Sequence, residues 1–259
     1  MVRRFDLDQR PLQTSAMSSR DYNQEHRDTA DKKYFYDFDA ILRRYMMKAF
    51  EPLLLPGKAL ELGCYKGDFT EILVERLSDL TVVEASDELI EYARARLSQK
   101  PTFIHSTFEA FKPTEHYDSI FLVHTLEHLD HPVEVLSAIN GWLSEHGRLF
   151  LAVPNANAAS RQIAVKMGLI SHNAAVTDSE RTHGHRCTYS LDTLERDTKE
   201  AGLRVVQRGG VIFKPLANFQ FDAALAAGTI SADYIEGCYQ LGMVYPDLCA
   251  SVYLVCEKG

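Results

Sequence analysis

Histidine side chains that could move a proton gather in two short stretches of this 259-residue chain. The first stretch holds His124, Glu127, His128 and His131, and the second holds His183, His185 and Arg186. A neutral imidazole accepts a proton near neutral pH, and an arginine fork can hold a carboxylate or a phosphate. We therefore predict His128, His183 and His185 as candidate general bases and Arg186 as an anchor for an anionic group of a substrate. The alternative for the second stretch is a capping loop that leads into a helix begun by Ser190.

A glycine turn earlier in the chain could hold a nucleotide-like ligand. Within Lys58–Phe69, a short apolar run suits a central parallel strand, and Gly63 and Gly67 bracket the turn that follows it. Residues Phe69–Leu77 then have apolar side chains at helical spacing. A strand, a glycine turn and a helix N-terminus together form a cradle of the nucleotide-binding type.

Further candidate contacts follow the next two predicted strands. Leu80–Glu84 is a short β-branched strand, and its final acid lies 21 residues after Gly63, where a carboxylate can accept hydrogen bonds from both ribose hydroxyls. The alternative for Glu84 is a solvated loop charge. After a third strand, Pro101–Ile104, Thr107, Phe108 and Glu109 would lie beside a purine or form an ordinary surface turn.

Strands and helices alternate through most of the chain, which predicts a parallel sheet with right-handed crossovers. The remaining strands are expected at Tyr117–His124, Gly147–Pro154, Leu203–Val206 and Ala250–Cys256. Helices are expected at Tyr34–Phe50, Ser86–Leu97, Val133–Glu145, Ser190–Ala201, Leu216–Ala227 and Ser231–Leu241. Residues 18–32 are polar and are expected to be irregular, and residues 1–16 could be an upstream extension.

Four stretches in order resemble the motifs of the class I S-adenosylmethionine-dependent methyltransferases. These are Glu61–Gly67, Glu84, Tyr117–His128 and Gly147–Pro154. The resemblance implies an α/β fold with a doubly wound, seven-stranded, mostly parallel sheet whose last strand is antiparallel. It implies S-adenosyl-L-methionine as cofactor and S-adenosyl-L-homocysteine as product. The implied cofactor contacts are Glu61, Gly63, Tyr65, Gly67, Glu84, Ala85, Ser86, Thr107, Phe108 and His124.

One position departs from the family's pattern. The first motif of the family usually has glycine where this chain has Tyr65, so the turn is bulkier at its centre. The same residue breaks the GxGxxG pattern that brings backbone against a pyrophosphate, which counts against a dinucleotide enzyme. S-adenosylmethionine has no phosphate, and its ammonium and carboxylate would instead meet Glu61, the Gly63 backbone and nearby polar groups.

The first histidine stretch also raises the question of a metal. His124 and His128 are four residues apart, so on a helical turn they would share a face and could bind a divalent ion beside Glu127. The Leu-Glu-His triplet also occurs in family members without a metal, and the metal-using ubiquinone and small-RNA methyltransferases have an acid where His124 stands here. We therefore assign no metal and predict Glu127 as a structural or substrate-positioning group.

Composition narrows the class of partner. The formal net charge is −8 and no basic run is present, which argues against nucleic acid. No apolar run suggests a membrane span, and five cysteines without CxxC spacing are typical of a reduced, cytoplasmic protein. We predict a small-molecule partner, with a homodimer left open.

Residues 1–33 are expected to form a flexible extension and lid segment, and 34–259 the methyltransferase domain. Insertions at about 155–187 and 214–247 would complete a helical lid, with Tyr22 and Tyr34 contacting the substrate. An enclosed pocket favours methyl transfer to an O or N atom of a small acceptor, first a sugar, sugar-nucleotide or natural-product intermediate. An aromatic or quinone-type acceptor is the alternative. Outside the class, a non-catalytic nucleoside-binding module and an NAD-dependent oxidoreductase stay open.

Overall fold

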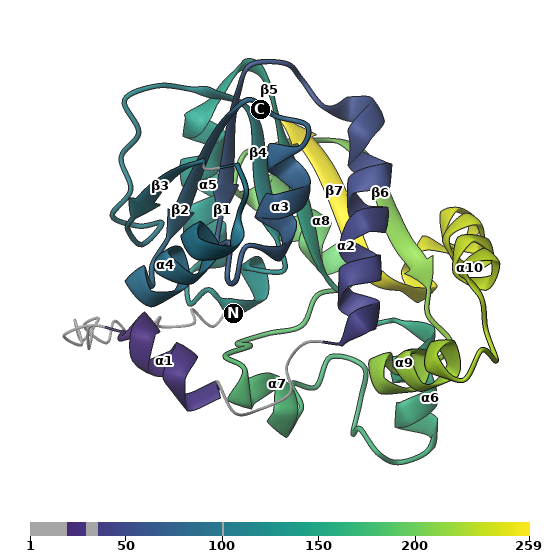
Figure 1. Ribbon diagram of the computed structural model, residues 1–259. Helices are drawn as coiled ribbons and strands as arrows, with labels where there is room; N and C mark the ends of the chain where they lie inside the picture. Colours follow the sequence, from purple (N-terminus) through teal and green to yellow (C-terminus); the bar gives the residue numbers. More distant parts are fainter. Residues whose placement is uncertain (1–19, 30–35, 100) are drawn as a thin grey trace, which may run out of the picture.

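The computed structural model describes residues 20–29, 36–99 and 101–259 (Figure 1). Its seven-stranded sheet has the order β3-β2-β1-β4-β5-β7-β6. The strands are β1 (Lys58–Leu62), β2 (Asp79–Glu84), β3 (Thr102–His105), β4 (Tyr117–Val123), β5 (Leu143–Pro154), β6 (Arg204–Phe213) and β7 (Cys249–Glu257). Only β7 runs antiparallel to its neighbours, β5 and β6. The predicted doubly wound sheet with an antiparallel last strand is therefore confirmed.

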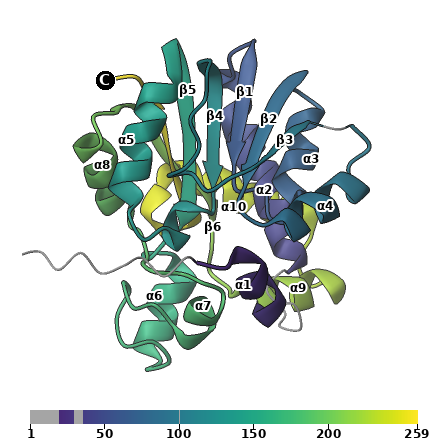
Figure 2. The same cartoon turned by 90° about the vertical axis from the view of Figure 1, so that its left-hand side faces the viewer.

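Helices cover both faces of the sheet (Figure 2). One face carries α2 (Asp37–Phe50), α3 (Asp68–Val74), α4 (Asp87–Arg96) and α10 (Ala232–Val244), and the other carries α5 (Pro132–Trp142) and α8 (Leu191–Glu200). Beyond the carboxyl ends of the parallel strands lie α1 (Tyr22–Thr29), α6 (Ala159–Lys166), α7 (Asp178–Thr182) and α9 (Asn218–Ala226). None of the helices in the described ranges is long and apolar enough to cross a membrane.

The central strands are apolar on both sides because both faces are covered. Leu60 and Ile120 pack in the layer against α5 and α8, whereas Phe121 stacks on Phe150 of β5 in the opposite layer, with ring centroids 4.9 Å apart. A strand buried on both faces has a nearly continuous hydrophobic sequence rather than an alternating one. This burial fixes the strand ends from which the functional loops emerge.

Three predicted elements need correction. The helix expected to end at Glu145 ends at Trp142, because Leu143 already pairs with Tyr117 in the sheet. The strand expected at Leu203–Val206 continues to Phe213, where it pairs with β7. Residues 18–32 are not irregular throughout, since 22–29 form α1. That helix depends on polar contacts with the distant α4, which hydrophobic periodicity does not reveal.

The two predicted insertions occupy different places. Residues 155–187 supply α6 and α7, and the segment after α7 reaches the cavity described below. Residues 214–247 supply α9, which packs on α2, and α10, which packs on β6. None of the residues 214–247 lines that cavity. Tyr34 and residues 1–16 lie outside the described residues.

Candidate functional site

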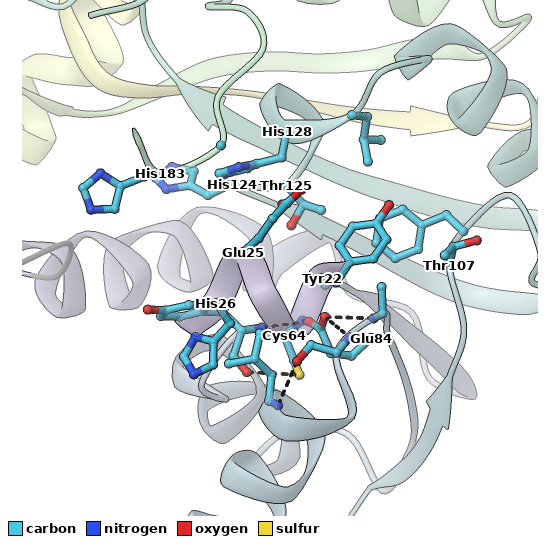
Figure 3. A pocket seen from close by; sticks show the side chains of 18 of the residues that line it. Tyr22, Glu25, His26, Cys64, Glu84, Thr107, His124, Thr125, His128 and His183 are labelled. Carbon is cyan, nitrogen blue, oxygen red and sulfur yellow. Dashed lines mark hydrogen bonds between the residues drawn. The ribbon is translucent and has the colours of Figure 1, made fainter. Parts of the chain in front are cut away.

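A cavity of about 390 Å³ opens at the carboxyl ends of β1, β2 and β4 (Figure 3). Its walls are the loops after these strands, together with α1 and residues 181–186. This volume lies within the usual range for small-molecule sites, and the position is the one where open α/β sheets bind ligands. We call the part formed by residues 61–65 and 84–86 the glycine-turn end, and the part formed by 124–129 and 181–186 the histidine end.

The turn after β1 requires a left-handed backbone at two cavity residues. Gly63 has φ +78°, and a Cβ added there would lie 2.8 Å from the side chain of Thr125. Tyr65 has φ +49°, a conformation that costs about 1–2 kcal/mol for a residue with a side chain. Gly67 caps α3 and packs against Ala93 of α4, so it supports the turn without lining the cavity.

Glu84 joins the loops after β1 and β2. One carboxylate oxygen accepts the backbone N–H groups of Cys64 and Tyr65 at 3.1 and 3.2 Å. The other accepts those of Ala85 and Ser86 at 2.8 and 3.1 Å (Figure 3). Burial raises the pKa of Glu84, and the four N–H donors act in the opposite direction. This carboxylate fixes the shape of the glycine-turn end.

Glu61 is the second buried acid at this end. Its side chain lines the cavity, and among the described residues no group donates a hydrogen bond to its Oε2. Burial raises the pKa of Glu61 to about 8, and the nearby charge of Glu84 adds to the shift. A buried carboxylate oxygen without a donor suits a cationic ligand, since an ammonium group would supply both charge and hydrogen bond.

Helix α1 covers the glycine-turn end. Asn23 accepts a hydrogen bond from Ser86 Oγ at 2.6 Å and donates one to Asp87 at 2.7 Å, while Arg27 pairs with Glu88 at 2.5 Å. Tyr22, Glu25 and His26 of this helix face the cavity, opposite the loops that carry Glu84 and Thr107 (Figure 3). Polar contacts with α4 therefore hold α1 over the site.

The turn after β4 places His124 in a left-handed conformation with φ +51°. Its Nε2 lies 2.8 Å from Ser251 Oγ on β7, which orients the ring across the strand ends. Burial, together with the positive charge of Arg43, holds the pKa of His124 well below its usual range. The imidazole is therefore neutral at physiological pH and does not add charge to the cavity wall.

Three titratable side chains meet at the histidine end. The rings of His128 and His185 are in edge contact, with centroids 4.6 Å apart, and His128 Nε2 lies 3.9 Å from Glu127 Oε1. Potential ligand atoms of the three residues lie within 4.8 Å of one another. Burial lowers the pKa of His128 to about 3 and raises that of Glu127 to about 8. The group can hold a divalent cation or accept a proton.

The segment after α7 completes this wall. Since a carbonyl oxygen only accepts, the 2.7 Å contact between His183 Nδ1 and Ser179 O assigns the proton to Nδ1. Arg186 forms an ion pair with Asp130 at 3.2 Å and remains half-exposed. Gly184 has φ +87°, and a Cβ there would lie 3.3 Å from His128. The glycine thus allows this segment to approach the histidine group closely.

Most predicted site residues line the cavity. They are Tyr22, Glu61, Gly63, Tyr65, Glu84, Ala85, Ser86, Thr107, Phe108, His124, His128, His183 and Arg186. Gly67, Glu127 and His185 support the wall without lining it. Lining residues that the sequence analysis missed include Arg20, Arg43, Thr125 and Arg181. Arg43 has no sequence signal, because it occupies the middle of a helix predicted from its apolar face.

Comparison with known proteins gives a family match, a relative with a similar sequence and solved structures with a similar fold. A family model described as a methyltransferase domain matches residues 32–208, more than half of the chain. The ubiquinone biosynthesis O-methyltransferase of Idiomarina loihiensis is 24% identical over 188 residues, which are 70% of this chain and 74% of that protein.

Solved structures share the fold. A methyltransferase of Thermotoga maritima, described as a possible histamine N-methyltransferase, superimposes with a TM-score of 0.60 at 16% identity, covering 91% of this chain and 100% of that one. The N-methyltransferase NodS of Bradyrhizobium japonicum, in complex with S-adenosyl-L-homocysteine, gives 0.58 at 16% identity, covering 91% and 96%. At these identities the likeness establishes the architecture.

Proposed function

The chain belongs to the methyltransferase domain family, and from that premise we propose that it methylates a hydroxyl group of a small acceptor, with His128 as the proton acceptor. It is an S-adenosylmethionine-dependent enzyme that acts on small molecules rather than a nicotinamide-dependent oxidoreductase. The acceptor and the residue roles are our proposal.

The glycine-turn end fits the cofactor. Glu61 offers a buried carboxylate oxygen for the ammonium group, and Gly63 keeps the floor of the cavity open where a Cβ would meet Thr125. Ala85 and Ser86, held by Glu84, would flank the ribose, and Phe108 would lie beside the adenine. When bound, the cofactor supplies an electrophilic methyl group on a sulfonium.

The proposal of a hydroxyl acceptor rests on the proton-accepting group at the histidine end of the cavity. A hydroxyl must lose its proton as it attacks, so O-methylation requires a base or a metal ion. His128 lines the cavity, and burial lowers its pKa, which keeps the ring neutral but also makes it a weaker base that needs a partner to stabilise the imidazolium. Glu127, close behind it, can ionise to stabilise the imidazolium that forms. His185 positions the His128 ring without lining the cavity.

An aromatic hydroxyl fits this base better than a sugar hydroxyl. A phenol has a pKa near 10, as in tyrosine, well below that of an aliphatic hydroxyl, so His128 assisted by Glu127 has a smaller pKa difference to overcome with a phenol than with a sugar. A ubiquinone biosynthesis O-methyltransferase is similar to this chain over 70% of the chain's length, and this similarity supports the same acceptor class. We therefore place the aromatic or quinone-type acceptor ahead of the sugar or sugar-nucleotide acceptor.

A metal-assisted version of the same reaction has its own support. Glu127, His128 and His185 can bring three ligand atoms within 4.8 Å of one another, a suitable set for a divalent cation. Such an ion would lower the pKa of a bound hydroxyl and replace the base. His124 would not complete the group through Nε2, because that atom contacts Ser251.

An acceptor panel with and without chelation tests both versions. The purified protein is incubated with labelled cofactor and either catechol-type or sugar acceptors, first in EDTA and then with added Mg²⁺ or Zn²⁺. Turnover of catechols in EDTA supports the His128 base, and turnover that requires metal supports the cation. Turnover of sugars but not of phenols would contradict the proposed acceptor. Failure to methylate any hydroxyl while amines are methylated would overturn O-methylation.

A further inference from the structure

Arg20 lies where three walls of the cavity meet. It precedes α1 and lines the cavity, and its side chain is only 17% exposed. Its Nη1 donates to the carbonyl oxygen of His128 at 3.0 Å and lies 3.5 Å from Asp130, whose other oxygen pairs with Arg186 at 3.2 Å. A Cβ added to Gly184, in the segment after α7, would lie 3.9 Å from Arg20 Nη2. Arg20 therefore contacts the turn that carries the proposed base and adjoins the segment after α7.

The guanidinium of Arg20 is held in a fixed orientation. Its Nε and Nη2 donate to the two carboxylate oxygens of Glu25 at 2.6 and 2.8 Å. Glu25 belongs to α1, and Arg20 Cζ lies 4.8 Å from the ring centroid of Tyr22 in the same helix. A planar fork that binds a carboxylate through two parallel hydrogen bonds also fixes the direction of its remaining N–H groups. The contact with Glu25 therefore directs Nη1 at the carbonyl of His128.

The short helix η2 (Leu126–His128) is held from two sides by its last carbonyl groups. Arg20 donates to the carbonyl of His128, and the backbone N–H of Arg186 donates to the carbonyl of Glu127 at 2.8 Å. Carbonyls at the end of a helix have no partner within it and need one outside. The position of His128 therefore depends on Arg20 on one side and on the segment after α7 on the other.

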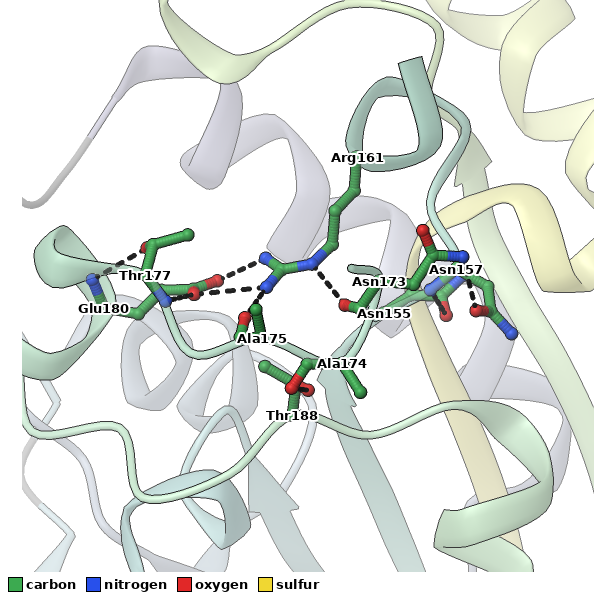
Figure 4. A network of polar contacts seen from close by, with 9 residues as sticks. All are labelled: Asn155, Asn157, Arg161, Asn173, Ala174, Ala175, Thr177, Glu180 and Thr188. Carbon is green, nitrogen blue, oxygen red and sulfur yellow. Dashed lines mark hydrogen bonds and ion pairs between the residues drawn. The ribbon is translucent and has the colours of Figure 1, made fainter. Parts of the chain in front are cut away.

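The segment after α7 has its own support. Arg161 of α6 donates to Glu180 Oε1 at 2.6 Å and to the backbone carbonyls of Asn173 and Ala175 (Figure 4). The N–H of His185 donates to the carbonyl of Glu180 at 3.0 Å. This network fixes α7 and the residues that follow it through contacts that do not involve Arg20. One side of η2 thus has a preformed anchor, and the other side depends on Arg20.

Helix α1 extends this anchor to the opposite end of the cavity. Asn23 binds Ser86 and Asp87 in the loop proposed to flank the ribose of the cofactor. The helix therefore connects the glycine-turn end with η2, and Arg20 makes the contact with η2. An element bound at both ends of a site can fix the distance between them. This distance matters, because a displacement of about 1 Å between reacting groups can cost about 100-fold in rate.

We propose that Arg20 is a positioning residue whose hydrogen bond to the carbonyl of His128 fixes the base relative to a cofactor bound under α1. This inference rests on the proposed function, because it takes His128 as the proton acceptor. Arg20 acts through the backbone of His128 and moves no proton itself, since an arginine side chain stays protonated in proteins.

Three substitutions test the inference. Arg20→Gln removes the fork and its charge, whereas Arg20→Lys keeps the charge but offers a single ammonium in place of the fork. Arg94→Gln is the matched control, since Arg94 is an exposed arginine of α4 that pairs with Glu91 and does not line the cavity. Each full-length protein is titrated with S-adenosyl-L-homocysteine by calorimetry and assayed with labelled cofactor and catechol. Urea unfolding checks that each variant is folded.

We expect Arg20→Gln to lower kcat with catechol by about 10- to 100-fold, while KM for catechol and Kd for S-adenosyl-L-homocysteine change by less than about threefold. Arg20→Lys should recover part of the lost turnover, and Arg94→Gln should match the wild type. In a His128→Gln background, Arg20→Gln should cause no further loss, because the group that it positions is gone.

A spectroscopic readout needs no acceptor. In protein labelled with ¹⁵N-histidine and saturated with S-adenosyl-L-homocysteine, the imidazole signals of His128 are those that disappear in His128→Gln. These signals should shift in Arg20→Gln and remain in place in Arg94→Gln. Unchanged His128 signals in Arg20→Gln would overturn the inference whatever the acceptor is.

The remaining outcomes separate this inference from the proposed function. Wild-type protein that methylates catechol, with Arg20→Gln equally active or Arg20→Lys fully active, overturns the positioning role alone. A full further loss from Arg20→Gln in the His128→Gln background does the same, because Arg20 would then act independently of His128. Wild-type protein that does not methylate catechol counts against the proposed function, and the imidazole signals still decide whether Arg20 positions His128.

Discussion

Buried carboxylates at the two ends of the cavity differ in how many hydrogen bonds they accept. At the glycine-turn end, Glu84 accepts four backbone N–H groups from two loops. At the histidine end, neither oxygen of Glu127 has a hydrogen-bond donor among the described residues. Both oxygens of one acid are therefore hydrogen-bonded, and in the described structure neither oxygen of the other is. The glycine-turn end is thus preorganised by its own backbone. Within the described ranges, the histidine end keeps polar atoms without hydrogen-bond partners, which can take part in the reaction.

Glu61 lies between these extremes and sharpens the comparison. It belongs to the glycine-turn end, yet its Oε2 also lacks a donor in the described structure. Its position at the end of β1 is where the proposed cofactor would bring an ammonium group. We therefore expect Glu61 to contact the ligand directly, whereas Glu127, which does not line the cavity, would act through His128.

The largest effect should come from removing the saturated acid. Glu84→Ala leaves four backbone N–H groups without an acceptor, two of them buried and two partly buried, so we expect the free energy of unfolding to fall by about 3–5 kcal/mol. Binding of S-adenosyl-L-homocysteine should be lost as well. Urea unfolding followed by circular dichroism measures the first effect, and calorimetry measures the second.

Glu109→Ala is the matched control, because Glu109 lines the same cavity but is exposed. It should change stability by less than about 0.5 kcal/mol. If Glu84→Ala were as stable as this control, the four N–H contacts would not hold the two loops together, and the contrast between the ends would disappear.

Substitutions at the histidine end should lower the turnover rate rather than the stability of the protein. His128→Gln removes the proton acceptor, and we expect turnover to fall by about 100-fold or more while cofactor affinity stays within about twofold. His185→Gln should reduce turnover less, because His185 acts through the His128 ring. Steady-state kinetics and calorimetry measure the two quantities separately.

His183→Gln serves as the comparison, since His183 is also a predicted base and lines the cavity. A larger loss of turnover in His183→Gln than in His128→Gln would transfer the proton acceptor to the segment after α7. Equal activity in all three variants would remove both the base and the metal ion from the mechanism, because His128 and His185 are also two of the three candidate metal ligands.

The sequence predicted the glycine-turn end more fully than the histidine end, and the reason is physical. Gly63, Glu84 and Ser86 act through backbone geometry and short-range spacing along consecutive strands, which a local pattern records. The contact between His128 and His185 joins residues 57 positions apart, and its geometry depends on how the segment after α7 folds back. No local pattern distinguishes His185, which supports the wall, from His183, which lines it.

Helix α1 illustrates the same limit. The sequence of α1 is polar on most sides, and its position depends on Asn23 meeting Ser86 and Asp87 across more than 60 residues.

Glu61 should give an effect of intermediate size with opposite signs in stability and binding. Its pKa is about 8 in the folded protein against 4.5 for the ordinary group, so the folded state binds more protons between these values. The stability that this group contributes is present below pH 4.5 and is lost as the pH rises through 8. Glu61→Gln should therefore stabilise the protein at pH 8 by about 1–3 kcal/mol relative to the wild type.

The same substitution should weaken binding of S-adenosyl-L-homocysteine by about tenfold, because the ammonium loses a charged partner. Urea unfolding at pH 5 and pH 8, paired with calorimetry at pH 8, tests both signs. A variant whose stability follows the wild-type pH dependence would show that Glu61 does not titrate in this range. Unchanged affinity would place the ammonium elsewhere.

The smallest effect concerns Tyr65, where this chain departs from the glycine usual in the family. Its left-handed backbone, φ +49°, favours glycine, but its ring meets His26 of α1 edge-on with centroids 6.1 Å apart. Tyr65→Gly and Tyr65→Ala both remove the ring, and only the glycine also relieves the backbone. We expect Tyr65→Gly to be more stable than Tyr65→Ala by about 0.5–1 kcal/mol, because the greater freedom of glycine in the unfolded chain offsets part of the relief. Urea unfolding measures this difference. If the two variants were equally stable, backbone strain at this turn would be negligible.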